Sequence, residues 1–145
     1  MSDILHFTFR TNKQVSGVKR HGINPFIFGP LKKDFEVFSK TILEVKPKYI
    51  IGFANISTKS HIESLTVNKF GKKGRILSDG ADSYALYLPK RSQFAVSNKP
   101  TNSFCNWTMY KIAELIEKEK LKTKLIFVHV NHIEHKGFST MLGIL

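Results

Sequence analysis

Tyr49-Ile50-Ile51-Gly52-Phe53 is an uninterrupted apolar run that follows the polar stretch Lys46-Pro47-Lys48. Strands buried on both faces have this composition, which is typical of a parallel sheet covered by helices. The preceding segment lies between Pro30 and Pro47, and its apolar residues repeat at helical spacing at Leu31, Phe35, Phe38, Ile42 and Leu43. The sequence therefore predicts a helix that leads into a buried strand.

The same order of elements recurs near the end of the chain. The segment from Phe104 to Lys120 has a helical apolar face, and Leu125-Ile126-Phe127-Val128-His129-Val130 is the most strand-like segment of the sequence. A repeated alternation of strands and helices favours a layered α/β fold. Further strands are predicted at Ile4–Phe9, Pro25–Phe28, Ile62–Val67, Ser83–Leu88 and Phe94–Val96, and loops at Arg10–Gly22 and Lys69–Gly80.

Length and composition indicate a single globular domain, residues 1–145, with 41% hydrophobic and 23% charged residues. The lone cysteine, Cys105, excludes an intrachain disulfide framework, a cysteine-rich zinc module and a dithiol redox pair. The N-terminus does not resemble a secretory signal, and no apolar run approaches the ~20 residues of a membrane helix. We therefore expect no membrane association and a cytoplasmic location.

The formal net charge of +12 favours contact with polyanions. Basic residues cluster in the two predicted loops, at Lys13, Lys19, Arg20 and His21, and at Lys69, Lys72, Lys73 and Arg75. Such loops suit phosphate contacts, but the sequence holds no motif of a known RNA- or DNA-binding module. The charge alone does not decide between a nucleic-acid partner and an ordinary solvated surface.

Three residues of the types that act together in nucleophilic catalysis lie near the ends of predicted elements. Cys105 opens the long helix, where the helix dipole and free N–H groups favour a thiolate. His129 lies in the last strand and Glu63 follows the buried strand, and strand ends and helix N-termini share the ligand crevice of α/β folds. A Cys-His-Glu triad is the functional interpretation. A buried apolar thiol, a sheet histidine and a solvated carboxylate are the structural ones.

Each of these residues lies in a short motif: Ile62-Glu63-Ser64-Leu65-Thr66-Val67-Asn68, Cys105-Asn106 with Tyr110 after it, and Phe127-Val128-His129-Val130. In this order, and with similar intervals, they resemble the motifs of pyroglutamyl peptidase type I, the intracellular cysteine peptidases also called pyrrolidone-carboxylate peptidases. A helix that ends at Lys46-Pro47 and a serine at Ser97 add to the resemblance. It covers about residues 31 to 130, with one large gap.

The resemblance implies a three-layer α/β/α sandwich of the phosphorylase/hydrolase-like type, with a reduced set of elements. It also implies removal of an N-terminal pyroglutamyl residue from a peptide substrate. In that reaction Cys105 would be the nucleophile, His129 the general base and acid, and Glu63 the carboxylate that orients the imidazole. No cofactor and no metal are required.

The substrate pocket departs more from the family than the nucleophilic motifs do. Ser64 stands where the family has Arg or Lys, and the segment between Glu63 and Cys105 is shortened. A lactam pocket should be apolar, so the candidates to line it are Phe7, Phe9 and Phe104. Arg75, in the loop after the glutamate motif, resembles an arginine of the family that helps the oxyanion, and the resemblance makes it the candidate for that role; its alternative is a solvated loop cation.

Two other interpretations follow from the same residues. A catalytically inactive, basic derivative of the fold that binds RNA or another acidic macromolecule would explain the charge, but not the retained reactive residues. His129, His132 and His135 with Glu134 would converge on a metal only on a helix. In a strand followed by a loop they would not, so we expect no metal site there. A homo-oligomer is compatible with the sequence.

Overall fold

The computed structural model describes residues 3–13, 15–101, 103–131 and 140–145. Its strands are β1 (Ile4–Phe9), β2 (Phe26–Phe28), β3 (Tyr49–Ile56), β4 (His61–Glu63), β5 (Leu65–Val67), β6 (Ser83–Ala85), β7 (Ala95–Ser97) and β8 (Lys124–Asn131). Its helices are α1 (Val15–Arg20), α2 (Leu31–Val45) and α3 (Phe104–Lys118), with a 3-10 turn, η1 (Gly71–Lys73).

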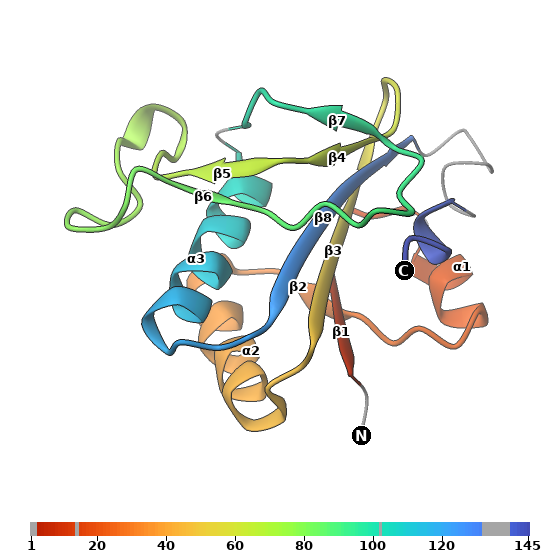
Figure 1. Cartoon of the computed structure of the whole chain (residues 1–145), viewed down its shortest axis with the longest axis horizontal. Helices are drawn as coiled ribbons and strands as arrows, with labels where there is room; N and C mark the ends of the chain where they lie inside the picture. Colours follow the sequence, from red (N-terminus) through yellow and green to blue (C-terminus); the bar gives the residue numbers. More distant parts are fainter. Residues whose placement is uncertain (1–2, 14, 102, 132–139) are drawn as a thin grey trace.

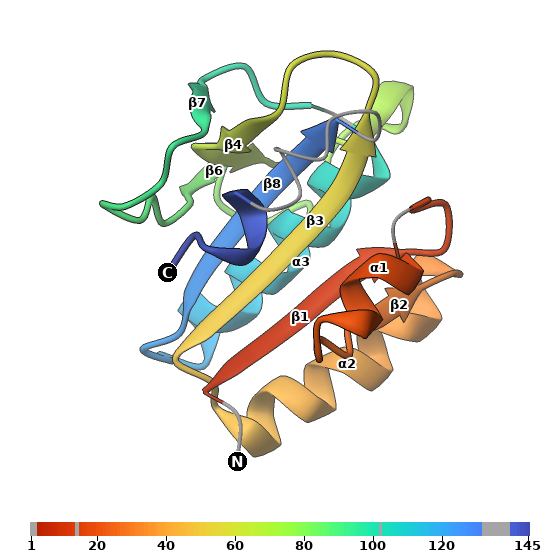
Figure 2. The ribbon, with the colours of Figure 1, turned by 90° about the vertical axis from the view of Figure 1, so that its right-hand side faces the viewer.

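One mixed sheet of six strands forms the centre, in the order β2-β1-β3-β8-β4-β7. β2, β1, β3 and β8 are parallel, β4 runs antiparallel to β8, and β7 is parallel to β4. Helices α2 and α3 cover one face of the sheet, and α1 and the C-terminal residues cover the other (Figures 1 and 2). The predicted three-layer α/β/α architecture is confirmed.

The layers follow from the period of two along the buried strands. In β3, Ile50 and Ala54 pack into the apolar cluster under α2 and α3, whereas Ile51 and Phe53 pack into the cluster on the opposite face. Both faces are apolar because both are covered, which is why the run contains no alternating polar residues. None of the described helices is both long and apolar enough to cross a membrane.

Two sequence predictions of local structure were wrong. The segment 10–22 contains the helix α1, whose one fully buried residue, Val18, packs against the sheet. The segment 62–67 is not one strand but two, because the chain leaves the main sheet at Ser64 and β5 pairs with β6 instead. Neither event has a periodic pattern in the sequence, since both are decided by tertiary contacts.

Gly52 provides a test of the packing under α2. Its register partner is Phe7, and a Cβ at position 52 would overlap the Phe7 ring. That ring cannot retreat, because it is fully buried among Phe9, Phe28, Phe38 and Phe127 at centroid separations of 5.7–6.1 Å. We expect Gly52→Ala to lower the free energy of unfolding by about 2 kcal/mol, measured by urea denaturation.

Gly29→Ala is the matched control for this substitution. A Cβ at Gly29 would meet only ordinary van der Waals contacts, the nearest at 3.5 Å from Asp34 Oδ2. We expect that variant to stay within ~0.5 kcal/mol of the wild type. Equal stabilities for the two variants would contradict the close packing of Phe7 on Gly52.

Candidate active site

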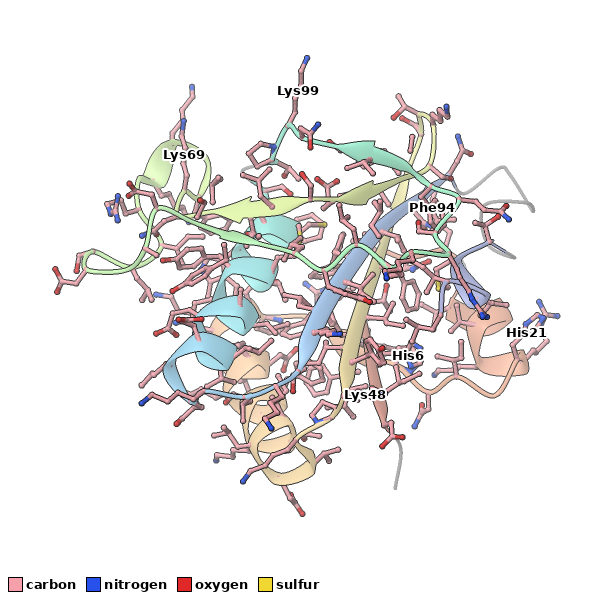
Figure 3. All side chains as sticks on the ribbon, viewed as in Figure 1. His6, His21, Lys48, Lys69, Phe94 and Lys99 are labelled. Atoms are coloured by element: carbon pink, nitrogen blue, oxygen red, sulfur yellow. The ribbon has the colours of Figure 1, made fainter. Side chains whose placement is uncertain are left out.

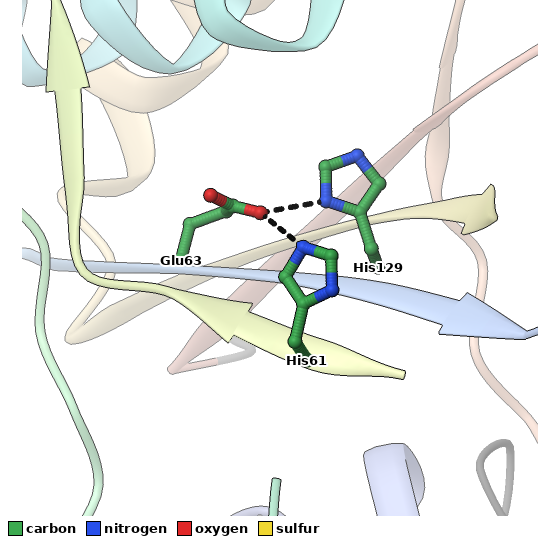
Figure 4. Close-up of side chains that lie close together, drawn as sticks. All are labelled: His61, Glu63 and His129. Carbon is green, nitrogen blue, oxygen red and sulfur yellow. Dashed lines mark hydrogen bonds and ion pairs between the residues drawn. The ribbon is translucent and has the colours of Figure 1, made fainter. Parts of the chain in front are cut away.

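A buried carboxylate–imidazole pair lies where β4 meets β8. The Nδ1 atom of His129 is 2.9 Å from Oε2 of Glu63, and the two residues are 7% and 1% exposed (Figure 4). Antiparallel pairing of β4 with β8 aligns Ile62 with Val128. The neighbours of this pair, Glu63 and His129, therefore project from the same face of the sheet.

His61 is a third member of this cluster that the sequence analysis did not single out. Its Nε2 lies 2.6 Å from the same Glu63 oxygen, and its Nδ1 lies 3.2 Å from the carbonyl oxygen of Lys59 (Figure 4). Both partners only accept hydrogen bonds, so this geometry favours the protonated ring of His61 over the neutral one. The hydrogen bond to Glu63 accordingly raises the pKa of His61.

Glu63 is held in its ionised form. Its burial acts to raise its pKa, but hydrogen bonds from His129 and His61 outweigh that effect and leave the pKa below its ordinary value. Since the carboxylate accepts the Nδ1 proton of His129, the other nitrogen, Nε2, is left as an acceptor. It points away from Glu63 (Figure 4).

Cys105 lies in the first turn of α3, as predicted. Its backbone N–H donates to Oγ of Ser103, the N-cap residue, at 3.3 Å. The thiol is 4% exposed and lines a pocket of about 430 Å³ together with Glu63 and His129. The three residues of the predicted triad thus border one pocket at the C-terminal end of β8.

The expectation that the helix start favours a thiolate was wrong for this state of the chain. Burial above all, together with the negative charge of Glu63, raises the pKa of Cys105 to about 12, although the hydrogen bond with Ser103 opposes both. Desolvation of a charged sulfur outweighs the helix dipole here. Cys105 is therefore a thiol, and a thiolate requires proton transfer within the pocket.

Asn106, next to the thiol, fixes the start of α3 against β5. Its Oδ1 accepts from the Thr66 hydroxyl at 2.7 Å and from the Val67 N–H at 3.0 Å. Its Nδ2 donates to the carbonyl oxygens of Val67 and Lys69 at 2.8 and 2.9 Å. Further along α3, the Tyr110 hydroxyl donates to the carbonyl oxygen of Ala81 at 2.7 Å. The Cys-Asn and Tyr positions of this motif therefore set where the thiol lies.

The aromatic residues predicted to line the pocket divide into three cases. Phe104 lines it and is 40% exposed. Phe9 lies behind that wall, with its ring edge-on to Phe104 at 4.8 Å. The prediction for Phe7 was wrong, because its ring is fully buried in the core beside Gly52.

The pocket is also more polar than a lactam site was expected to be. Apart from the thiol of Cys105, its apolar side chains are Ile56 and Phe104. The others are Asn55, His61, Glu63, Ser97, Lys99, Thr101, Ser103 and His129. A larger cavity of about 670 Å³ beside β1, β2 and α2 contains His6 but no thiol or carboxylate. The thiol, the imidazole and the carboxylate of the predicted triad therefore all line the smaller of these two pockets.

Arg75, the candidate oxyanion residue, does not line this pocket. Its guanidinium donates to Asp82 Oδ1 at 2.9 Å and to the Gly80 carbonyl oxygen at 2.7 Å. The alternative of a solvated loop cation describes it better. Ser64, which replaces a basic residue of the family, donates to the Ser97 carbonyl oxygen at 2.8 Å and so ties β4 to β7. His132, Glu134 and His135 lie outside the described residues.

No protein-family model matches the chain. A curated pyrrolidone-carboxylate peptidase of Lactobacillus helveticus is 27% identical over 121 residues, which is 68% of this chain and 60% of that protein. This chain therefore spans less than two thirds of the length of that relative.

Solved structures share the fold. Pyrrolidone carboxyl peptidase from Thermococcus litoralis superposes with a TM-score of 0.70 at 18% identity, covering 90% of this chain and 77% of that one. The enzyme from Pyrococcus furiosus gives a TM-score of 0.71 at 20% identity, covering 97% and 85%. In sequence and in fold, this chain is therefore similar to the pyrrolidone-carboxylate peptidases.

Proposed function

We propose that the chain is a cysteine peptidase that removes an N-terminal pyroglutamyl residue from peptides. The observation that carries the proposal is the buried hydrogen bond between His129 Nδ1 and Glu63 Oε2, in a pocket that Cys105 also lines. This bond supports the tautomer in which His129 Nδ1 donates to Glu63 and Nε2 acts as the base. Names of relatives alone would not carry this conclusion, because the chain spans only part of the curated relative.

In the proposed reaction, His129 Nε2 takes the proton of the Cys105 thiol while sulfur attacks the pyroglutamyl carbonyl carbon. The tetrahedral oxyanion lies near the positive end of the α3 dipole. Its collapse breaks the C–N bond, and His129 returns the proton to the leaving amine. Water, deprotonated by His129, then hydrolyses the thioester and releases pyroglutamate and the free thiol. No cofactor takes part.

Glu63 stabilises the imidazolium that forms on His129, and Phe104 offers its exposed face to the lactam ring. With Cys105 buried and its pKa near 12, little thiolate exists before substrate binds. Proton transfer to His129 therefore accompanies attack rather than preceding it. In this reaction, the rate depends on the relative geometry of Cys105 and His129 more than on an ion pair formed before substrate binds.

The test is release of aminomethylcoumarin from its pyroglutamyl amide by the wild type and by Cys105→Ser. We expect turnover by the wild type and a loss of at least about 1,000-fold in the variant. The prolyl amide, which lacks the lactam carbonyl, is the matched control for ring recognition. A wild type that folds but hydrolyses neither amide would falsify the peptidase proposal.

Alkylation of Cys105 by iodoacetamide gives a second readout that needs no substrate. If His129 accepts the thiol proton, we expect His129→Gln to slow alkylation by at least about tenfold at neutral pH. Burial of the thiol is common to both proteins, so the ratio isolates the imidazole. Equal rates would contradict the assignment of His129 as the base.

The net charge of +12 favours a second candidate, a non-catalytic protein that binds RNA or another acidic macromolecule. Lys72 and Lys73 are exposed in η1, and Lys69 and Lys99 extend into solvent above the sheet (Figure 3). Under this candidate, binding of a labelled RNA should fall steeply between 50 and 200 mM salt, as for proteins that neutralise several phosphates. Salt-dependent RNA binding together with absent hydrolysis would favour it over the peptidase.

A further inference from the structure

His61 adds a second hydrogen-bond donor to Glu63. The pair of Glu63 and His129 does not need this donor. Strand pairing puts His61 directly opposite His129, and their ring centroids are 5.0 Å apart. Both rings bind the same oxygen of Glu63, through His61 Nε2 at 2.6 Å and His129 Nδ1 at 2.9 Å (Figure 4). Three potential ligand atoms of His61, Glu63 and His129 lie within 4.8 Å of one another.

Glu63 also has an oxygen whose binding capacity is unused. Oε1 is the one buried side-chain polar atom, among the residues that the structure describes, that has no hydrogen-bond partner. The residue is only 1% exposed, so bulk water does not satisfy this oxygen. A buried carboxylate oxygen without a donor is costly unless a cation or another ligand occupies the site.

We propose that His61, Glu63 and His129 form a binding site for one divalent cation of the zinc class. Two imidazole nitrogens and a carboxylate form one of the ligand sets that bind Zn²⁺ when a fourth position stays open to solvent or substrate. The open position would face the pocket that Cys105 lines. Upon binding, the cation takes the place of the two N–H protons that now lie between the rings and Glu63.

The surroundings suit such a site. The Nδ1 of His61 faces the carbonyl oxygen of Lys59, and an outer hydrogen bond of this kind orients a metal-binding imidazole through its opposite nitrogen. Ligand atoms around a tetrahedral Zn²⁺ are about 3.4 Å apart. The present separations of 2.6 and 2.9 Å would therefore open by less than 1 Å, within the reach of side-chain rotation.

Occupation by a metal has a consequence that rests on the proposed function. The cation would hold His129 Nδ1 and the Glu63 carboxylate, and so would break the hydrogen bond between them on which the proposed reaction relies. It would therefore act as a reversible inhibitor of the peptidase. Binding itself does not depend on that reaction, so the two can fail separately.

The experiment is calorimetric titration of the EDTA-treated, dialysed chain with ZnCl₂ in the absence of substrate. We expect one ion per chain, and an affinity at least about 100-fold weaker in His61→Gln. His21→Gln is the matched control and should leave binding unchanged, since His21 follows α1 (Figure 3), contacts the Gly17 carbonyl oxygen and does not line the pocket of the cluster. The double variant His132→Gln/His135→Gln separates this site from one that uses the histidines after β8.

No binding by the wild type would overturn the proposal, as would loss of binding only in the His132/His135 variant. Should His61→Gln not fold, protection of His61 by the metal in the wild type decides instead. Zn²⁺ should protect His61 from carbethoxylation by diethyl pyrocarbonate, mapped by mass spectrometry, while His21 stays reactive. If His61 reacts equally with and without Zn²⁺, the site does not exist. Inhibition of hydrolysis, reversed by EDTA, is measured separately and tests only the consequence.

Discussion

Glu63→Gln is expected to lower kcat/KM for a pyroglutamyl amide by about 1,000-fold while the chain remains folded. Glutamine has the same shape as glutamate, and its amide oxygen can still accept from His129 and His61. What it lacks is the negative charge that stabilises the imidazolium on His129 during attack. The loss should therefore appear in kcat more than in KM. Steady-state kinetics across pH 6–9 measure it.

The control is Glu44→Gln, which makes the same chemical change on the exposed surface of α2. Its kcat/KM should equal that of the wild type. If Glu63→Gln retains more than about a tenth of wild-type activity, Glu63 is not the third member of a triad, and its bonds to the two histidines are structural. A loss of helical circular dichroism in Glu63→Gln would instead show that the charge serves folding.

Elements with a strong period were predictable from the sequence. The apolar positions of α2 repeat at helical spacing, and β3 and β8 are continuous apolar runs, so their type and their burial on both faces followed directly. α1 was missed because Gly17 and Ser16 are poor helix formers, and the helix is stabilised by Val18 packing on the sheet. Short elements of this kind are decided by tertiary contacts.

The candidate site was predictable in part for the same reason. Cys105 and His129 lie at recognisable ends of long elements, so each could be placed on its own element. Whether the two meet depends on the order of the strands in the sheet, which no local pattern contains. His61 and Glu63 are two residues apart, so a strand must place them on one face. That spacing was visible in the sequence. The antiparallel orientation of β4, which brings both residues to His129, was not, because the reversal of the chain between β3 and β4 has no periodic pattern in the sequence.

Depth within a layer is the other property that sequence patterns do not contain. Phe7 and Phe9 share one face of β1, and both were candidates for the pocket wall. Only Phe9 reaches Phe104, because Phe7 lies one pleat further down the strand and is covered by the rings of Phe28 and Phe38. The face of the sheet on which a residue lies can be inferred from the alternation of residues along the strand. How far that residue lies from the edge of the sheet can be inferred only from the pairing register of the strands.

Asn106→Asp is expected to lower the free energy of unfolding by about 4 kcal/mol, a large share of the 5–15 kcal/mol that stabilises a typical domain. The amide is fully buried and uses two donors and two acceptor bonds. Aspartate keeps the acceptor side but turns a lone pair toward the carbonyl oxygens of Val67 and Lys69. The result is two lost bonds, repulsion between the carboxylate and those two carbonyl oxygens, and a buried negative charge.

Asn98→Asp separates this effect from the chemical change itself. Asn98 accepts a hydrogen bond from the Ser64 hydroxyl at 3.0 Å on the surface, and a carboxylate can accept it equally well. Urea denaturation should place Asn98→Asp within ~0.5 kcal/mol of the wild type. If the two variants were equally stable, the four bonds of Asn106 would not hold the start of α3 on β5. Cys105 would then have to be positioned by the N-cap at Ser103 alone, because no other side chain in the first turn of α3 is tied to β5 among the residues described.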